Sequence, residues 1–229
     1  MIIINRLKLH IQYKNNEGIS VPGVSTLKSQ LGWNREQLMG WVKRVTLEGE
    51  DYNEIRRRGG GAGTLVHSLI SDYFRAIKTE KTIITDTSEF NDKEISLAEN
   101  AYLSFLEYVK DKTVKPVLIE EPLISEQYQF GGTPDLYDDD WTLWDWKSGS
   151  GIFKEDLVQV VGGYTLLLNE NNHPVDKVIL LNIPKTEDDK FYPIIIDNER
   201  DILACQNILI SCREIYGEKK IINRIKEVR

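Results

Sequence analysis

The chain has 229 residues, of which 41% are hydrophobic and 28% charged, so it can bury a substantial core and is neither disordered nor collagen-like. Its formal charge of −7 excludes non-specific coating of nucleic acid, so any DNA contact must come from a local basic patch. Two cysteines, Cys205 and Cys212, cannot by themselves form a disulfide framework, a four-cysteine zinc site or an iron–sulfur cluster. No apolar run is long enough to span a membrane, and we expect a soluble cytoplasmic protein.

The N-terminal part is predicted to be a strand followed by helices. Residues 2–13 are typical of an extended strand, and short helices are expected at about 25–31 and 35–47. The run Arg56-Arg57-Arg58-Gly59-Gly60-Gly61 is then expected to open a helix that reaches about Lys78.

The rest of the chain predicts a mixed sheet flanked by helices. A long helix is expected at about 93–110, and β-branched and aromatic residues then favour strands. The later elements are predicted as strands 117–125, 130–137 and 141–146, a buried helix 155–168, strands 177–183 and 191–196, and a closing helix 199–216. The order is typical of an α/β fold.

The chain contains no internal repeat and no Pro/Ser-rich linker, which predicts a single domain over residues 1–229. We expect residues 1–60 to form a strand and helical extension, residues 61–216 the core, and residues 217–229 a C-terminal tail.

The most informative segment is Gly-Gly-Thr-Pro-Asp at 131–135, followed by Asp145-Trp146-Lys147. On a strand, Asp145 and Lys147 project to one face, and an acidic turn would bring Asp135 alongside Asp145. Two converging carboxylates repel each other unless a cation lies between them, and hard oxygen ligands suit Mg²⁺ or Mn²⁺. A metal, an activated water and an ammonium group are what phosphodiester hydrolysis requires. The alternative is a surface hairpin with an exposed Asp145–Lys147 ion pair.

His67 falls at the edge of the apolar face of the helix that follows the glycines. A lone histidine there is usually a packed, hydrogen-bonded residue. A neutral imidazole facing the two aspartates would instead complete a metal site and favour Mn²⁺ over Mg²⁺.

Taken in order, the Gly-Thr-Leu-Val-His67 segment, Gly-Thr-Pro-Asp135, Asp145-Trp-Lys147 and Gln159 with Tyr164 resemble the RecB-like branch of the PD-(D/E)xK nuclease superfamily. The pattern is similar to that of compact phage-type exonucleases and their mitochondrial genome-maintenance relative. The resemblance spans about residues 19–168. It implies a restriction-endonuclease-like core with elements in αβββαβ order and a helical N-terminal region.

The resemblance also implies roles for individual residues. Asp135 and Asp145 match the metal-binding acids of the family, and the backbone carbonyl of Trp146 matches a further ligand. His67 matches the histidine that binds metal in this branch, and Lys147 matches the lysine that assists the attacking water.

Family members also place a catalytic glutamine and tyrosine near the scissile DNA strand, and Gln159 and Tyr164 match them. The usual spacing is one helical turn, whereas these two residues are five apart and therefore about 140° apart around a regular helix. A kink or bulge at Gly162-Gly163 would bring them together; otherwise Tyr164 belongs to the core.

Two further positions carry weaker signals. Glu121, or its neighbour Glu120, lies where related nucleases carry an extra acidic metal ligand, and strand alternation does not say which of them faces the site. Arg57 and Arg58 precede the glycines and could grip DNA phosphate with the help of helix N-terminal amides, although charge runs are more often simply solvated.

The function implied is a DNA exonuclease that depends on Mg²⁺ or Mn²⁺ and acts from DNA ends in recombination, repair or replication, in a bacterial or phage-infected cell. The expected partners are DNA with a free end and a recombination or replication protein, with no membrane. The iron–sulfur variants of this branch need four cysteines, and ATP use is unsupported because no Gly-Lys-Ser/Thr follows Gly59–Thr64. The alternatives are a non-catalytic DNA-end-binding or recombination-partner module, or a structure-specific endonuclease.

Overall fold

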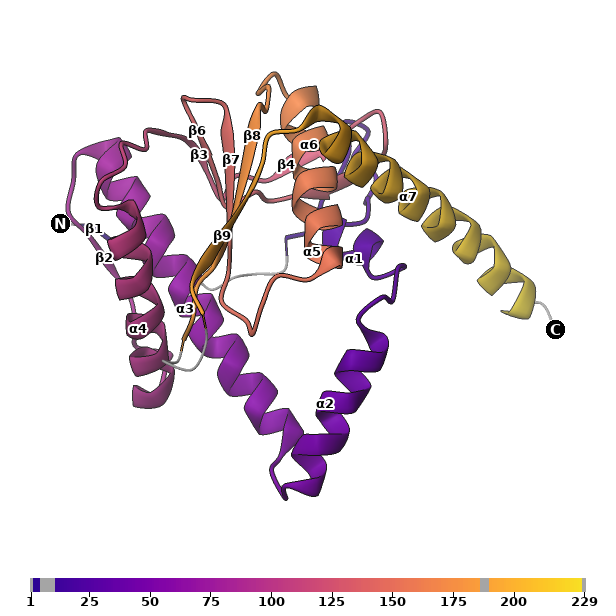
Figure 1. Ribbon diagram of the computed structural model, residues 1–229. Coiled ribbons are helices and arrows are strands. Elements are labelled where there is room, and N and C mark those ends of the chain that lie inside the picture. The colour runs from indigo at the N-terminus through magenta and orange to yellow at the C-terminus, as the bar shows by residue number, and fades with distance from the viewer. Residues whose placement is uncertain (1, 5–10, 186–189, 228–229) are drawn as a thin grey trace.

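The computed structural model describes residues 2–4, 11–185 and 190–227 (Figure 1). Its centre is a five-stranded sheet in which only β7 and β8 run parallel. The strands, in spatial order, are β3 (Pro116–Ile119), β6 (Leu136–Asp138), β7 (Thr142–Lys147), β8 (Lys177–Asn182) and β9 (Tyr192–Ile196). The predicted mixed sheet flanked by helices is therefore confirmed.

Helices cover both faces of this sheet (Figure 1). On one face α3 (Tyr52–Thr79) and α4 (Asp92–Val109) bury an aromatic core that includes Phe74, Phe105 and Trp146. The other face packs on a continuous helical segment made of α5 (Lys154–Leu157), a π-helical stretch η1 (Val158–Tyr164) and α6 (Thr165–Glu170). This second face is closed by α1 (Val24–Lys28) and α7 (Glu199–Glu227).

The predicted strands 117–125 and 130–137 are each broken into two shorter strands. The expected strand 117–125 becomes β3 and β4 (Leu123–Ser125), because Glu120 has a left-handed backbone with φ of 49° and Pro122 follows. The expected strand 130–137 becomes β5 (Phe130–Gly132) and β6, with Pro134 between them. β4 and β5 pair with each other outside the main sheet. The breaks matter because Glu120 and Asp135 lie at them.

The N-terminal helices correct one prediction. The expected helix 35–47 is confirmed as α2 (Arg35–Leu47), but α3 does not begin at the glycines. It begins at Tyr52, because the Asp51 carboxylate caps it by accepting from the N–H groups of Asn53 and Glu54. The glycines therefore lie inside the helix, where a Cβ on Gly61 would lie 2.4 Å from the Glu94 carboxylate of α4.

The chain ends differ from expectation in two places. Within the predicted N-terminal strand, β1 (Ile2–Ile4) pairs in parallel with β2 (Ile83–Thr85), while residues 5–10 lie outside the described part. The closing helix does not stop at residue 216, and α7 continues through most of the predicted tail, to Glu227. Across the described residues, no helix combines the length and the apolar character that a membrane span needs.

The π-helical stretch is where the buried helix crosses α7. A Cβ on Gly162 would lie 2.4 Å from the backbone carbonyl oxygen of Cys205, and one on Gly163 would lie 2.5 Å from the Val24 side chain. Both α7, which carries Cys205, and α1, which carries Val24, can approach this stretch so closely only because glycine has no side chain. Cys205 and Cys212 are free thiols on α7, and burial raises the pKa of both.

We expect Gly162→Ala to lower the free energy of unfolding by about 1–3 kcal/mol, because the added methyl group meets backbone that cannot rotate away. Gly217→Ala is the matched control, since its Cβ would contact only a flexible Arg213 guanidinium at 3.4 Å and alanine favours the helix. Thermal and urea unfolding of both variants measure the effect. Equal stability of the two would contradict the close crossing.

Candidate metal centre and active site

The pairing of β6 with β7 places the two predicted aspartates on neighbouring strands. Leu136 pairs with Trp144, so Asp135 and Asp145 are the next opposed positions in this antiparallel register. The Asp138 carboxylate fixes the register, since it accepts from the Thr142 N–H at 2.9 Å and from the Trp144 indole N–H at 2.7 Å. Asp135 is 8% exposed and Asp145 only 1%.

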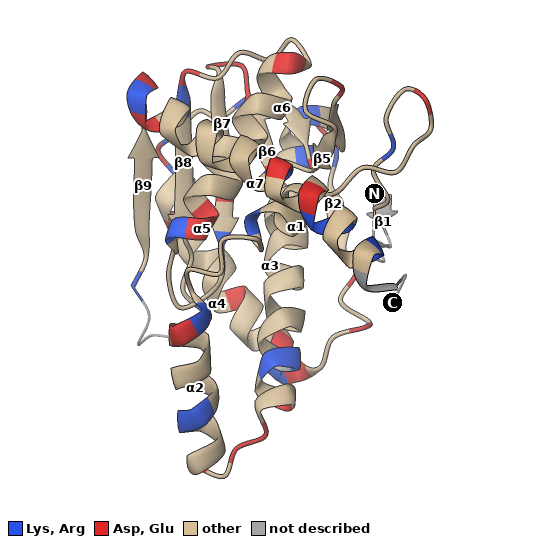
Figure 2. Cartoon of the chain, turned by 90° about the vertical axis from the view of Figure 1, so that its right-hand side faces the viewer, with Lys and Arg blue, Asp and Glu red and all other residues tan. Residues whose placement is uncertain are grey.

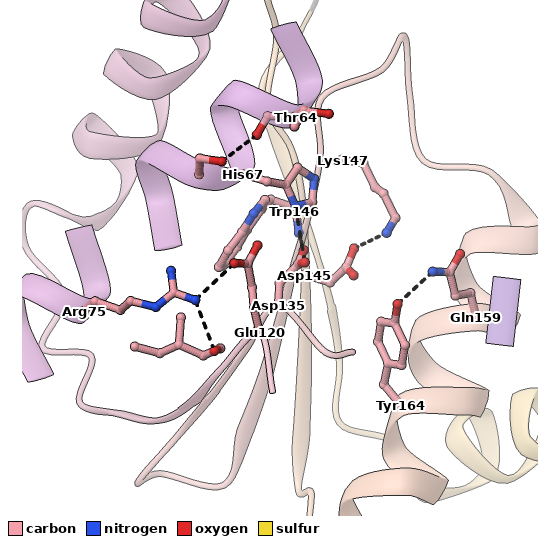
Figure 3. Close-up of polar contacts among 12 residues, drawn as sticks. Thr64, His67, Arg75, Glu120, Asp135, Asp145, Trp146, Lys147, Gln159 and Tyr164 are labelled. Carbon is pink, nitrogen blue, oxygen red and sulfur yellow. Dashed lines mark hydrogen bonds and ion pairs between the residues drawn. The ribbon is translucent and has the colours of Figure 1, made fainter. Parts of the chain in front are cut away.

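Three potential ligand atoms converge beside these strands (Figure 3). One atom each from His67, Glu120 and Asp135 lie within 4.8 Å of one another. His67 comes from α3, and its Nδ1 lies 3.3 Å from Oδ1 of Asp135. That Nδ1 is buried and faces the Asp135 carboxylate, so a nitrogen and an oxygen that could both bind a cation point to the same place.

Of the two neighbouring glutamates, the structure brings Glu120 and not Glu121 to the cluster. The left-handed backbone at Glu120 lets its N–H donate to the carbonyl oxygen of Asp135 at 3.0 Å, while its Oε2 lies 3.1 Å from Nη2 of Arg75 on α3. Glu121 is exposed and takes no part in the cluster. Glu121 was the first choice from the sequence, and Arg75 was not predicted, because it lies with Ser71 and Asp72 away from the apolar face of the His67 helix.

Asp145 and Lys147 project from β7 together, as the alternation predicts. Oδ1 of Asp145 lies 2.5 Å from Nζ of Lys147, and both side chains are largely buried, so the alternative of an exposed surface pair is excluded. Between them along the strand, the backbone N–H of Trp146 donates to Oδ2 of Asp135 at 3.1 Å. Binding of metal by Asp145 and by the Trp146 carbonyl stays a prediction, since the converging atoms belong to His67, Glu120 and Asp135.

Burial and charge set the protonation of these groups. Burial raises the pKa of Asp145 to about 6, with Lys147 opposing the shift and the Asp135 carboxylate adding to it. Burial also acts to raise the pKa of Asp135, but nearby His67 and Lys147 outweigh it and leave that pKa lowered. Burial acts to lower the pKa of Lys147, but the charges of Asp145 and Asp135 outweigh it. The pKa of Lys147 is therefore raised, and its ammonium stays charged. One carboxylate is thus ionised and the other is poised to lose its proton.

The π-helical stretch resolves the spacing of Gln159 and Tyr164. Its hydrogen bonds run from residue i to residue i+5, which brings residues five apart onto one side. The Gln159 amide N–H donates to the Tyr164 hydroxyl at 2.9 Å, and Figure 3 shows both side chains across from Lys147. Tyr164 is largely buried, and this burial together with Asp145 raises its pKa. The bulge expected at Gly162-Gly163 is therefore present.

The arginine run lies apart from a helix N-terminus. Arg57 is exposed, and its Nη1 lies 3.6 Å from the Glu94 carboxylate. The Arg58 side chain lies outside the described part of the chain. Because these residues and the following glycines are inside α3, their amides are not open to a phosphate, and the expected help from helix N-terminal amides is wrong.

The imidazole nitrogen and two carboxylates fit a divalent cation of the Mg²⁺ or Mn²⁺ class, and the nitrogen favours Mn²⁺. Arg75 holds one of the carboxylates in place. Three further polar groups lie near this centre: the ammonium of Lys147 on β7, and the amide of Gln159 and the phenol of Tyr164 on η1 (Figure 3). This set can bind and orient an anionic ester.

Neither a protein-family model nor a curated protein matches the sequence. Among solved structures, an alkaline exonuclease from Laribacter hongkongensis is 14% identical over 57% of this chain and 71% of its own, with a TM-score of 0.38. The same enzyme in complex with dAMP is 13% identical, covers 74% and 95%, and has a TM-score of 0.38. A candidate exonuclease from Eubacterium rectale is 13% identical, covers 66% and 64%, and has a TM-score of 0.44. At these identities and TM-scores the likeness carries no functional argument.

We expect Glu120→Gln to weaken Mn²⁺ binding by about 10–100-fold, because the cluster loses an anionic ligand. Glu121→Gln is the matched control and should bind Mn²⁺ like the unaltered chain. Isothermal titration of the purified proteins with Mn²⁺ alone measures both. Equal Mn²⁺ affinities of the two variants would show that Glu120 does not bind the metal.

The raised pKa of Asp145 predicts a pH-dependent stability. Without metal, its neutral carboxyl contributes stability that is complete below about pH 3.8 and is lost as the pH rises through about 6. Asp145→Asn lacks this contribution. We expect the stability of the natural chain relative to Asp145→Asn to fall by about 1 kcal/mol between pH 5 and 8. Thermal unfolding in EDTA measures it, and a pH-independent difference would contradict the shift.

Proposed function

We propose that the chain is a divalent-metal-dependent nuclease that hydrolyses phosphodiester bonds of DNA from free ends. The observation that carries the proposal is the convergence of His67, Glu120 and Asp135 beside the buried Asp145–Lys147 pair. A buried cluster of acids costs stability, and such strained, perturbed groups gather at functional sites.

The donor set suits a cation that, when bound, polarises a phosphate oxygen and lowers the pKa of an attacking water. Asp135 is the ionised member of the pair and is aligned by the Trp146 N–H. Glu120 is held by the Arg75 guanidinium, so its carboxylate cannot swing away when substrate arrives. These contacts preorganise the centre, which is how a protein lowers the cost of reorganisation during the reaction.

Lys147 serves the substrate side of the site. Its charged ammonium, 2.5 Å from Asp145, can stabilise the negative charge that develops on the phosphate or orient the attacking water. Gln159 and Tyr164 face it from η1 and can donate to the scissile strand. Their mutual hydrogen bond fixes both side chains before substrate binds.

Action on DNA from its ends, in recombination, repair or replication, follows from the ordered motifs that resemble the RecB-like exonucleases. Mg²⁺ or Mn²⁺ is the cofactor in this proposal, with neither an iron–sulfur cluster nor ATP. The expected partners are DNA with a free end and a recombination or replication protein.

The test is cleavage of linear and covalently closed circular DNA, single- and double-stranded, with Mg²⁺, Mn²⁺ or EDTA. We expect metal-dependent loss of the linear forms only, and a rate at least about 100-fold lower for Lys147→Ala because its ammonium acts in the transition state. Lys177→Ala is the matched control, since this lysine begins the neighbouring strand and forms an ion pair with Asp140 at 3.9 Å.

Each other outcome has a definite meaning. Cutting of closed circles would make the enzyme an endonuclease. A folded Lys147→Ala variant that cuts at the natural rate would refute the assigned mechanism. If the chain binds DNA but does not cleave it with any metal, the alternative of a non-catalytic DNA-end-binding module would be favoured over the enzyme.

A further inference from the structure

A pocket lies at the start of α5, the helix that leads into η1 and its Gln159 and Tyr164. It has a volume of about 520 Å³. Its lining residues come from two segments far apart in the chain, namely Trp33, Asn34 and Gln37 around the start of α2, and Ile152, Phe153 and Lys154 after β7. The volume falls within the range of about 300–1,000 Å³ that small-molecule sites occupy.

Hydrogen bonds and an ion pair hold the two walls together. The backbone N–H and the side-chain amide of Asn34 both donate to the Glu155 carboxylate, at 3.2 and 3.1 Å. Lys28 binds the Asp156 carboxylate at 2.7 Å. The acidic groups at the start of α5 are thus engaged in holding the walls. Of the lining residues that the structure describes, Lys154 alone carries a charge, and that charge is positive.

The pocket presents two aromatic rings to solvent. Trp33 is 47% exposed and Phe153 is 38% exposed, which is unfavourable for large apolar rings unless something covers them. Stacking of a nucleobase on such a ring is worth about 1–3 kcal/mol and does not depend on the identity of the base. The amide groups of Asn34 and Gln37 can bond to base edges, and Lys154 can bind a phosphate.

The pocket is joined to the active site by one helical segment. Phe153 immediately precedes α5, and Gln159 lies six residues further, about 9 Å along a helix axis. A stacked strand advances about 3.4 Å per nucleotide, so the pocket lies two or three nucleotides from the residues that face Lys147. Figure 2 shows the start of α2 and α5 on the same side of the molecule.

We propose that this pocket binds an unpaired nucleobase of single-stranded DNA while the same strand passes Lys147 and Gln159. The inference rests on the proposed function and assigns it a single-stranded substrate. A base inside a duplex is paired and stacked between its neighbours, so it cannot enter the pocket unless it is first extruded. The flexible backbone of a single strand lets one base turn aside without that cost.

The first test is binding in EDTA, which prevents cleavage. Fluorescence anisotropy would compare a labelled single-stranded oligothymidine with a blunt duplex of the same length. We expect Trp33→Ala and Phe153→Ala each to weaken single-strand binding about tenfold and to leave duplex binding unchanged. Trp33→Phe, which keeps a ring for stacking, should restore most of the affinity. Trp141→Ala is the matched control, because this tryptophan is 51% exposed in the β6–β7 turn.

The second test locates the base. A single abasic nucleotide, moved stepwise along the oligonucleotide, should weaken binding to the natural chain at one position and have no effect there in Trp33→Ala. Circular dichroism confirms that each variant is folded. Single-strand affinity that is unchanged in both Trp33→Ala and Phe153→Ala would overturn the pocket assignment, as would an abasic nucleotide without any positional effect.

The two proposals fail in distinguishable ways. If the natural chain cuts DNA with Mn²⁺ but Trp33 and Phe153 make no difference to binding, the pocket is wrong and the nuclease stands. If binding depends on Trp33 and on one base position but no metal supports cleavage, the pocket stands and the nuclease is wrong.

Discussion

The site depends on holding ionisable carboxyl groups together against their mutual repulsion. Strand register opposes Asp135 to Asp145, and the left-handed backbone at Glu120 brings a third carboxylate beside them. Water would screen these charges at the surface, but the groups are largely buried, so the protein must supply compensation. It does so with cations from both faces of the sheet, Arg75 on one side and Lys147 on the other.

This arrangement explains why the site lies where two hydrophobic cores meet. His67 and Arg75 extend from α3, which packs on the aromatic core of one face, whereas Lys147 points toward η1 on the other face. Each core fixes part of the site rigidly. The raised pKa of Asp145 shows the remaining cost of burying these carboxyl groups together.

The π-helical stretch η1 also contributes to the geometry of the site. A regular α-helix would point Tyr164 away from Gln159, whereas the π-helical stretch lets their side chains bond and face Lys147. The glycines that allow α7 to pack closely against this stretch therefore support both packing and site geometry. The same segment begins at Phe153, so it also connects the candidate base pocket to the candidate catalytic groups.

Features of the site that depend on local pattern could be predicted from the amino-acid sequence. Strand alternation placed Asp145 and Lys147 on one face, the acidic turn brought Asp135 beside them, and the helix expected at about 35–47 coincides with α2. The choice between Glu120 and Glu121 could not be predicted, because it depends on a left-handed residue that interrupts the strand alternation. Two further features depend on the tertiary structure: where α3 begins, and that Trp33 and Phe153 line the same pocket. The Asp51 cap begins α3 before the glycines that were expected to open it. The Asn34–Glu155 contact joins residues 121 apart in the chain, which no local pattern encodes.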